Sequence, residues 1–174
     1  MKELPTLGFM EAIKLASSRI LDFQGRSRRS EFWWWMLLVM IANWLFSSLT
    51  SSLLICAIIA TIVMFFGLAV TVRRLQDTGK SAWWVYISYA LGIVNNIMTA
   101  TSHSMNQLVE MAKSGNIDER AIEKIMSNGI GEFMAISGIS ALMAIVSIIV
   151  IIMCLMDSSP STNKYGESPK YVEA

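Results

Sequence analysis

Residues 53–72 read LLICAIIATIVMFFGLAVTV, and no side chain in this run carries a charge. A helix of about 20 mostly apolar residues is long enough to cross the hydrocarbon core of a bilayer. Three more uncharged runs of similar length occupy residues 32–49, 83–99 and 133–155. All four are apolar on every side, which would leave a soluble chain of 174 residues with nothing to face water. The sequence therefore predicts an all-α polytopic membrane protein with four transmembrane helices.

The composition supports the same class. Hydrophobic residues make up 54% of the chain and charged residues 16%, whereas soluble domains are roughly 45–50% apolar and about 25% charged. The 14 Lys and Arg nearly balance the 13 Asp and Glu, so no overall basic field favours a nucleic-acid partner. One His and two Cys are too few for a zinc site with four nitrogen or sulfur ligands. We expect a single integral membrane domain over residues 1–174, with no metal and no cofactor.

The basic residues are sorted along the chain. Eleven of them lie in residues 1–31, between the second and third spans, or after the fourth span. The other three lie in residues 100–132, where five acidic residues offset them. Because Lys and Arg are retained on the cytoplasmic side, we expect both termini to be cytoplasmic. Tryptophans at 33–35 and 83–84 open two of the spans on that same side, as is typical of headgroup-level aromatic belts.

Three segments fall outside the predicted spans. In residues 1–31, the apolar side chains from Gly8 to Phe23 recur at helical spacing. They predict a cytoplasmic amphipathic helix that lies either on the membrane surface or on the bundle's own loops. Residues 100–132 contain two helical signals, the second with Asn116 as N-cap and Glu119 three residues later. They predict an extracytoplasmic helical hairpin or outward extensions of the spans, and residues 156–174 form a cytoplasmic tail.

Three polar motifs lie on the predicted cytoplasmic side. They read FQGRSRRSEFW at 23–33, RRLQDTGKSAWW at 73–84 and NKYGESP at 163–169. In these motifs the sequence resembles the small bacterial inner-membrane proteins of the YhaH/YhaI type, grouped as domain-of-unknown-function family 805. The resemblance implies a multi-pass protein of the bacterial inner membrane without an established activity. Gln76 stands where the family usually has His, so proton transfer in this loop would lack a group that titrates near neutral pH.

The motifs supply a candidate site for an anion or a lipid headgroup. In one interpretation its arginines only set the topology and lie beside anionic lipids. In the other, Glu31 and Asp77 pair with arginines at the membrane boundary, lock the two loops together and leave spare guanidinium donors for a phosphate. Gly79 would supply the unusual backbone angle of the turn between the second and third spans. The candidate residues are Arg26, Arg28, Arg29, Glu31, Arg73, Arg74, Asp77, Gly79, Lys80 and Tyr165.

Three classes of function fit these features. The preferred class is a non-enzymatic membrane protein whose basic cytoplasmic face binds anionic lipid headgroups or a protein partner. The second is a small transporter or channel, which would require a homo-oligomer and a polar path along Asn43, Asn95 and Asn96. The third is a membrane enzyme acting on lipid headgroups, for which Glu31, Asp77 and Ser81 are the available set. Because no general base with a pKa near neutral accompanies that set, we assign no catalytic residue.

Overall fold

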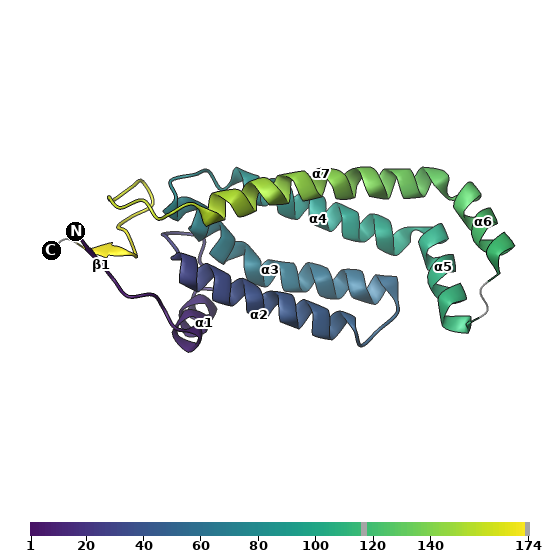
Figure 1. Ribbon diagram of the computed structural model, residues 1–174, viewed down its shortest axis with the longest axis horizontal. Coiled ribbons are helices and arrows are strands. Elements are labelled where there is room, and N and C mark those ends of the chain that lie inside the picture. Colours follow the sequence, from purple (N-terminus) through teal and green to yellow (C-terminus); the bar gives the residue numbers. More distant parts are fainter. Residues whose placement is uncertain (116–117, 173–174) are drawn as a thin grey trace.

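The computed structural model describes residues 1–115 and 118–172, and within them the chain forms an elongated helical bundle (Figure 1). This confirms the all-α prediction. The elements in chain order are β1 (Lys2–Glu3), α1 (Phe9–Ser18), α2 (Arg29–Ser47), α3 (Leu53–Asp77), α4 (Trp83–Thr101), α5 (His103–Ser114), α6 (Glu119–Asn128), α7 (Ile130–Leu155) and β2 (Tyr171–Val172).

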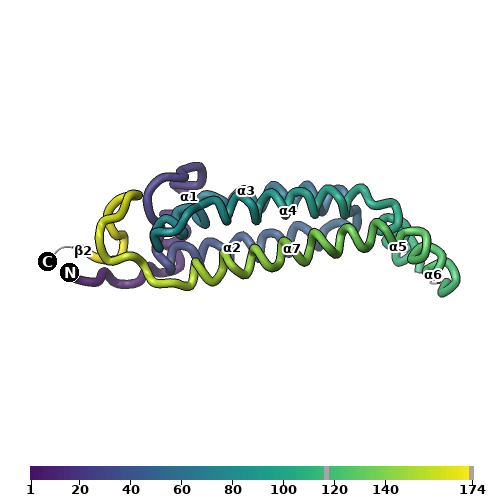
Figure 2. The backbone as a smooth tube through the Cα atoms, turned by 90° about the horizontal axis from the view of Figure 1, so that it is seen from above, coloured from purple at the N-terminus to yellow at the C-terminus, as the bar shows by residue number. Residues whose placement is uncertain are grey.

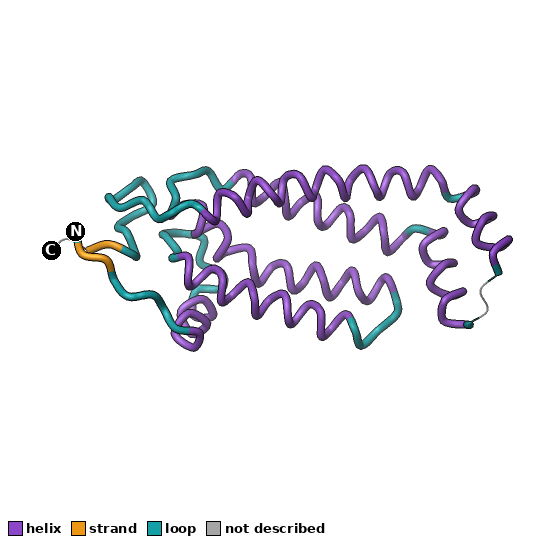
Figure 3. The backbone as a smooth tube through the Cα atoms, in the orientation of Figure 1, coloured by secondary structure: helices purple, strands orange, loops and turns teal. Residues whose placement is uncertain are grey.

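Four long helices run side by side along the bundle. Helix α7 packs along α4, α4 along α3, and α3 along α2. Viewed from above, α3 and α4 form one side of the bundle and α2 and α7 the other (Figure 2). We call the end that holds α1 and both strands the arginine end, and the end that holds α5 and α6 the hairpin end. Most of the loop structure lies at the arginine end (Figure 3).

The long helices present apolar side chains to their surroundings. Helices α3 and α7, of 25 and 26 residues, are long and apolar enough to cross a membrane, and little of either apolar window is buried inside the bundle. On α3, Ile58 and Ile62 are 51% and 53% exposed, and on α7, Ile145 and Ile148 are 58% and 56% exposed. Soluble monomers rarely expose contiguous apolar surface on this scale. These helix faces therefore suit a hydrocarbon environment.

Three pairs of polar side chains join the long helices. Asn96 Nδ2 on α4 donates to Thr61 Oγ1 on α3 over 3.1 Å. The adjacent Asn95 Oδ1 accepts from Ser140 Oγ of α7 over 2.7 Å, and the hydroxyls of Ser88 on α4 and Ser147 on α7 lie 3.0 Å apart. Such bonds between apolar helices satisfy polar groups that lipid cannot solvate.

The segment between α4 and α7 is a helical hairpin in which α5 turns away from the axis of α4 (Figure 1). Ser102 caps α5, because its hydroxyl accepts from the Met105 amide over 3.1 Å. Glu132 of α7 accepts from the Ser102 hydroxyl over 2.6 Å and so joins the bases of α5 and α7. The predicted N-cap Asn116 lies outside the described residues. The second helix begins at Glu119, where the Asp118 carboxylate accepts from the Arg120 amide over 3.0 Å.

Several helix boundaries differ from the sequence prediction, and two of them differ by five residues. Helix α3 continues five residues past position 72, to Asp77, and helix α1 ends at Ser18 instead of Phe23. The first difference arises because nothing in residues 73–77 breaks a helix, and the side chains of Arg73, Arg74 and Asp77 find buried partners. Helix α1 packs on α2 with Ala12 and Ala16 buried, while Phe9 and other large apolar side chains stay exposed.

Candidate functional site

The C-terminal turns of α3 carry the second motif. Helix α3 ends in a Schellman motif, in which Gly79 N donates to Gln76 O over 3.1 Å and Lys80 N donates to Leu75 O over 2.9 Å. Gly79 has φ +73°, as the sequence predicts for this turn. Because successive residues of a helix are about 100° apart, Arg73 and Arg74 point toward different neighbours.

Asp77 is the acceptor on which the first two motifs and the tail meet. Its side chain is fully buried. Oδ1 accepts from Arg26 Nε of the first motif over 2.9 Å. Oδ2 accepts from Arg74 Nη1 and, over 2.5 Å, from Ser158 Oγ of the tail. One carboxylate therefore joins the segment before α2, the end of α3 and the segment after α7.

Arg26 holds the tail against the bundle. Its Nη1 donates to the carbonyls of Ser161 and Gly166 over 3.0 and 3.3 Å. Its Nη2 donates to the carbonyls of Asp77 and Ser159. The third motif adds a bond of its own, from Asn163 Nδ2 to the Gln76 carbonyl over 3.0 Å. The tail is thus fixed to the end of α3 by backbone acceptors.

Arg74 binds the C-terminus of α7. Its Nε donates to the Cys154 carbonyl over 3.0 Å, and its Nη2 donates to the Met156 carbonyl. Arg29, at the start of α2, donates to the Leu155 carbonyl between them. The last carbonyls of a helix lack intrahelical partners and carry partial negative charge, so cations stabilise this end of α7.

Arg73 serves the segment that follows α1 and the first turn of α2. Its Nη1 donates to the carbonyls of Arg19, over 2.7 Å, and Asp22. Its Nη2 forms an ion pair with Glu31 Oε1 at 3.1 Å. Neighbouring arginines on α3 therefore bind opposite ends of the chain.

We call Arg26, Arg73, Arg74, Glu31 and Asp77 the arginine cluster. No member is more than 5% exposed, and three guanidinium groups face two carboxylates, which leaves one positive charge in excess. Among the described residues, Arg73 Nε is a buried donor without a partner. Nearly every other guanidinium donor in the cluster binds a protein carbonyl or carboxylate, so the cluster holds segments together and offers little to a phosphate.

The other candidate residues surround the cluster. Arg28 is 9% exposed, and its Nη2 donates to the Leu4 carbonyl over 2.8 Å. Arg29 and Lys80 are exposed. Tyr165 precedes Gly166, whose carbonyl accepts from Arg26, and its own ring contacts Lys164 Nζ at 4.9 Å from the centroid. Spare donors for an anion are therefore found at Arg28, Arg29 and Lys80.

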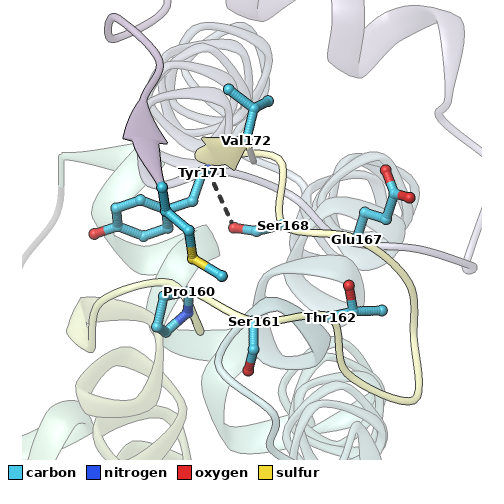
Figure 4. Close-up of a pocket in the computed structure, with 8 residues that line it drawn as sticks. Pro160, Ser161, Thr162, Glu167, Ser168, Tyr171 and Val172 are labelled. Carbon is cyan, nitrogen blue, oxygen red and sulfur yellow. Dashed lines mark hydrogen bonds between the residues drawn. The ribbon is translucent and has the colours of Figure 1, made fainter. Parts of the chain in front are cut away.

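Two cavities open at the arginine end. The larger, of about 550 Å³, lies between the tail and the paired strands (Figure 4). Its wall includes Glu167 and Tyr171, whose amide donates to Ser168 Oγ over 3.3 Å, but no Lys or Arg of the described residues. The smaller, of about 180 Å³, is strongly basic. It is lined by Glu3, Thr6, Arg28, Arg29, Ser30, Ser158 and Lys170.

An ion-pair network borders the smaller cavity. Lys170 Nζ lies 2.9 Å from Asp157 Oδ2 and 3.3 Å from Glu3 Oε1, and Arg29 Nη1 lies 4.0 Å from Asp157 Oδ1. Contacts with Tyr171 and then Asp157 raise the pKa of Lys170. The hydrogen bond from Lys170 lowers the pKa of Asp157. This network joins the tail to the N-terminal strand and to α2.

The acceptors that organise this end were not predicted from the sequence. Most are backbone carbonyls, at positions such as 154, 156, 159 and 161, and a carbonyl has no signature in the sequence. Ser158 was also missed. In the sequence it is one of several polar residues in the segment after α7. Only its hydrogen bond to Asp77 shows that it fixes the tail to the end of α3.

The family model described as "Protein of unknown function (DUF805)" matches residues 20–167, which include the first two motifs and most of the third. The chain is 31% identical over 94 residues to "Inner membrane protein YhaH" of Escherichia coli strain K12, covering 45% of this chain and 78% of the relative. The same values hold for the protein of that name in Escherichia coli O157:H7. No solved structure matches this chain. The family match confirms the resemblance carried by the three motifs, and the chain therefore belongs to the DUF805 family of proteins of unknown function.

Proposed function

We propose that the chain is a non-enzymatic inner-membrane protein with four spans, whose cytoplasmic arginine end binds anionic lipid headgroups. Helices α3 and α7 have the length and composition of spans. Helices α2 and α4 lie alongside them and expose residues such as Trp44 and Ile97. The E. coli relative is named an inner membrane protein. An even number of spans puts both termini on one side, together with eleven of the 14 basic residues.

One observation carries the proposal of headgroup binding. The three motifs converge at one end of the bundle, where their arginine cluster has an excess positive charge. Around it, Lys14, Arg29 and Lys80 are exposed, as are Trp33 and Trp83, the rings of which suit the headgroup layer. Each basic residue near an anionic leaflet contributes about 1 kcal/mol. The cluster fixes the shape of this end, and the exposed cations provide the attraction.

The test reverses exposed charges and leaves the arginine cluster intact. Lys14→Glu with Lys80→Glu should lower the ratio of phosphatidylglycerol to phosphatidylcholine retained by the protein, after extraction from mixed vesicles, by about tenfold or more. The matched control is Lys113→Glu with Lys124→Glu, two exposed positions at the hairpin end that should leave the ratio unchanged. Mass spectrometry of the retained lipid gives the ratio, and labelling of single cysteines from each side reports the orientation.

An unchanged lipid ratio in a correctly oriented Lys14→Glu, Lys80→Glu protein would overturn headgroup binding, and a protein partner would become the better proposal for this face. The transporter alternative has one supporting observation, since Asn43 Oδ1 is buried without a partner among the described residues. By contrast, Asn95 and Asn96 bond to neighbouring helices. Solute flux in vesicles that is lost on Asn43→Leu would favour a transporter.

A further inference from the structure

We propose that the 180 Å³ cavity at the start of α2 is a phosphate-binding site. It lies within the face to which we assign headgroup binding, and so it rests on that function and gives it a location. We call it the α2 cavity, lined by the seven residues named above. The ligand chemistry is a phosphate group, supplied either by a lipid headgroup or by a soluble phosphate.

Arg28 is the first observation that points to an anion. Its side chain is about nine-tenths buried and lines the α2 cavity. Only Nη2 has a partner within the described part of the chain, the Leu4 carbonyl at 2.8 Å. Nε and Nη1 of this cavity-lining side chain have no hydrogen-bond partner among the described residues. A buried guanidinium group is stable when its charge is paired and its donors are bound, and phosphate oxygens fit this geometry.

The first turn of α2 is the second observation. Arg29 and Ser30 of this turn line the cavity. For a 19-residue helix the amides of the first turn carry partial positive charge, and no side chain of the described residues caps them. Glu31, the acidic residue of this turn, is turned away to Arg73. An oxoanion in the cavity would meet both this helix start and the Arg29 side chain.

The opposite wall adds a third cation, Lys170, and a carboxylate, Glu3, that would compete with phosphate for it. Lys170 lines the cavity, but Asp157 and Glu3 hold its ammonium group at 2.9 and 3.3 Å. Glu3 is exposed and belongs to a strand of only two residues, β1. An exposed ion pair of this kind contributes little stability. A phosphate can therefore take the place of the Glu3 carboxylate, while Asp157 continues to orient Lys170.

The cavity is large enough for a phosphate group and is linked to the arginine cluster. At roughly 30 Å³ per water, 180 Å³ accommodates a phosphate group with some of its hydration. Ser158 lines the cavity and also donates to Asp77, so one residue links the cavity to the arginine cluster. The larger cavity, whose described lining has no Lys or Arg, lacks this chemistry.

The experiment uses the full chain in detergent and titrates inorganic phosphate by calorimetry at fixed ionic strength. Arg29→Gln should weaken binding by about tenfold or more, because a charge-assisted bond is lost. Glu3→Gln should tighten binding by about twofold to fivefold, because a competing carboxylate is removed. Structural damage would not tighten binding. Lys113→Gln, at the hairpin end, is the control and should change nothing.

A second arm repeats the series with nanodiscs of phosphatidate in phosphatidylcholine. The expected pattern with inorganic phosphate supports a soluble ligand, and the same pattern in nanodiscs alone supports a lipid headgroup. Absence of binding in both arms, or binding that ignores Arg29→Gln and Glu3→Gln, overturns the site. Since Lys14 and Lys80 lie outside the cavity lining, their effect on lipid retention reports on the proposed function separately.

Discussion

Asp77→Asn removes one negative charge from the centre of the arginine cluster without changing the volume of the side chain. The carboxylate has no exposure and accepts from Arg26, Arg74 and Ser158. The amide keeps one acceptor oxygen, but its NH₂ group faces donors. Three guanidinium groups then share the single carboxylate of Glu31, so the excess positive charge in the buried cluster doubles.

The cost can be bounded from these contacts. Hydrogen bonds to charged groups contribute about 1.5–3 kcal/mol each, and Asp77 loses at least one of its three side-chain partners. Removal of one partner from a buried ion pair costs about 3–5 kcal/mol, because the other charge stays buried and unpaired. We therefore expect a loss of about 3–5 kcal/mol in the free energy of unfolding. For a chain of this length that corresponds to roughly 6–20 °C in Tm.

The assay is reversible unfolding of the purified protein in mixed micelles, followed by circular dichroism. Glu110→Gln is the control, because Glu110 pairs with Lys113 on the exposed hairpin and should cost less than about 1 kcal/mol. In a double-mutant cycle, Asp77→Asn and Arg26→Met should couple by about 1–3 kcal/mol. A change below about 1 kcal/mol for Asp77→Asn, or additive effects in the cycle, would refute the assignment of Asp77 as the centre of the cluster.

Two further predictions concern the turn after α3 and the docked tail. Gly79→Ala forces a side chain into the left-handed region at φ +73° and should cost about 1–2 kcal/mol in unfolding, with Gly79→Asn less damaging; equal values for the two would contradict the turn geometry. The pKa of Asp157 is lowered, so its stabilisation of the tail is full above about pH 4 and falls as the pH drops. The pKa of Lys170 is raised, so its stabilisation is full below about pH 10 and falls at higher pH. Limited proteolysis of the tail should therefore be slowest between these two pH limits. A cleavage rate that changes neither below about pH 4 nor above about pH 10 would exclude a stabilising role for the ion pair between Asp157 and Lys170.

The helices were largely predictable because their signals are local. Uncharged runs of 17 or more residues predicted the four long helices. Apolar residues at helical spacing predicted α1, which precedes α2, and the hairpin between α4 and α7. The end of α3 was not predictable in this way. Arg73 and Arg74 look like the start of a loop when only hydropathy is considered, yet they continue the helix because distant carbonyls accept their donors.

The candidate site was predictable in its residue types but not in its pairing. The expected pairing of Glu31 and Asp77 with arginines, which would lock the two loops together, did not specify which arginine each carboxylate would bind. In the structure Glu31 pairs with Arg73, 42 positions away, and Asp77 binds Arg26, 51 positions away. Only Arg74 and Asp77 pair locally, as i and i+3 on one helix. Which arginines retain free donors depended on these distant pairings, and therefore Arg28 could not be distinguished from Arg26 by sequence alone.

The arrangement of the long helices explains why so many charges are buried at one end. Packing runs from α2 through α3 and α4 to α7, so α2 and α7 lie at the two ends of this series. Apolar contacts between successive helices do not by themselves fix the distance between the first and the last. At the arginine end that distance is fixed by Arg29 and Arg74, which bind the C-terminus of α7 from α2 and α3. Arginine suits this task better than lysine, because one planar guanidinium group with five donors bridges several carbonyls and a carboxylate at once.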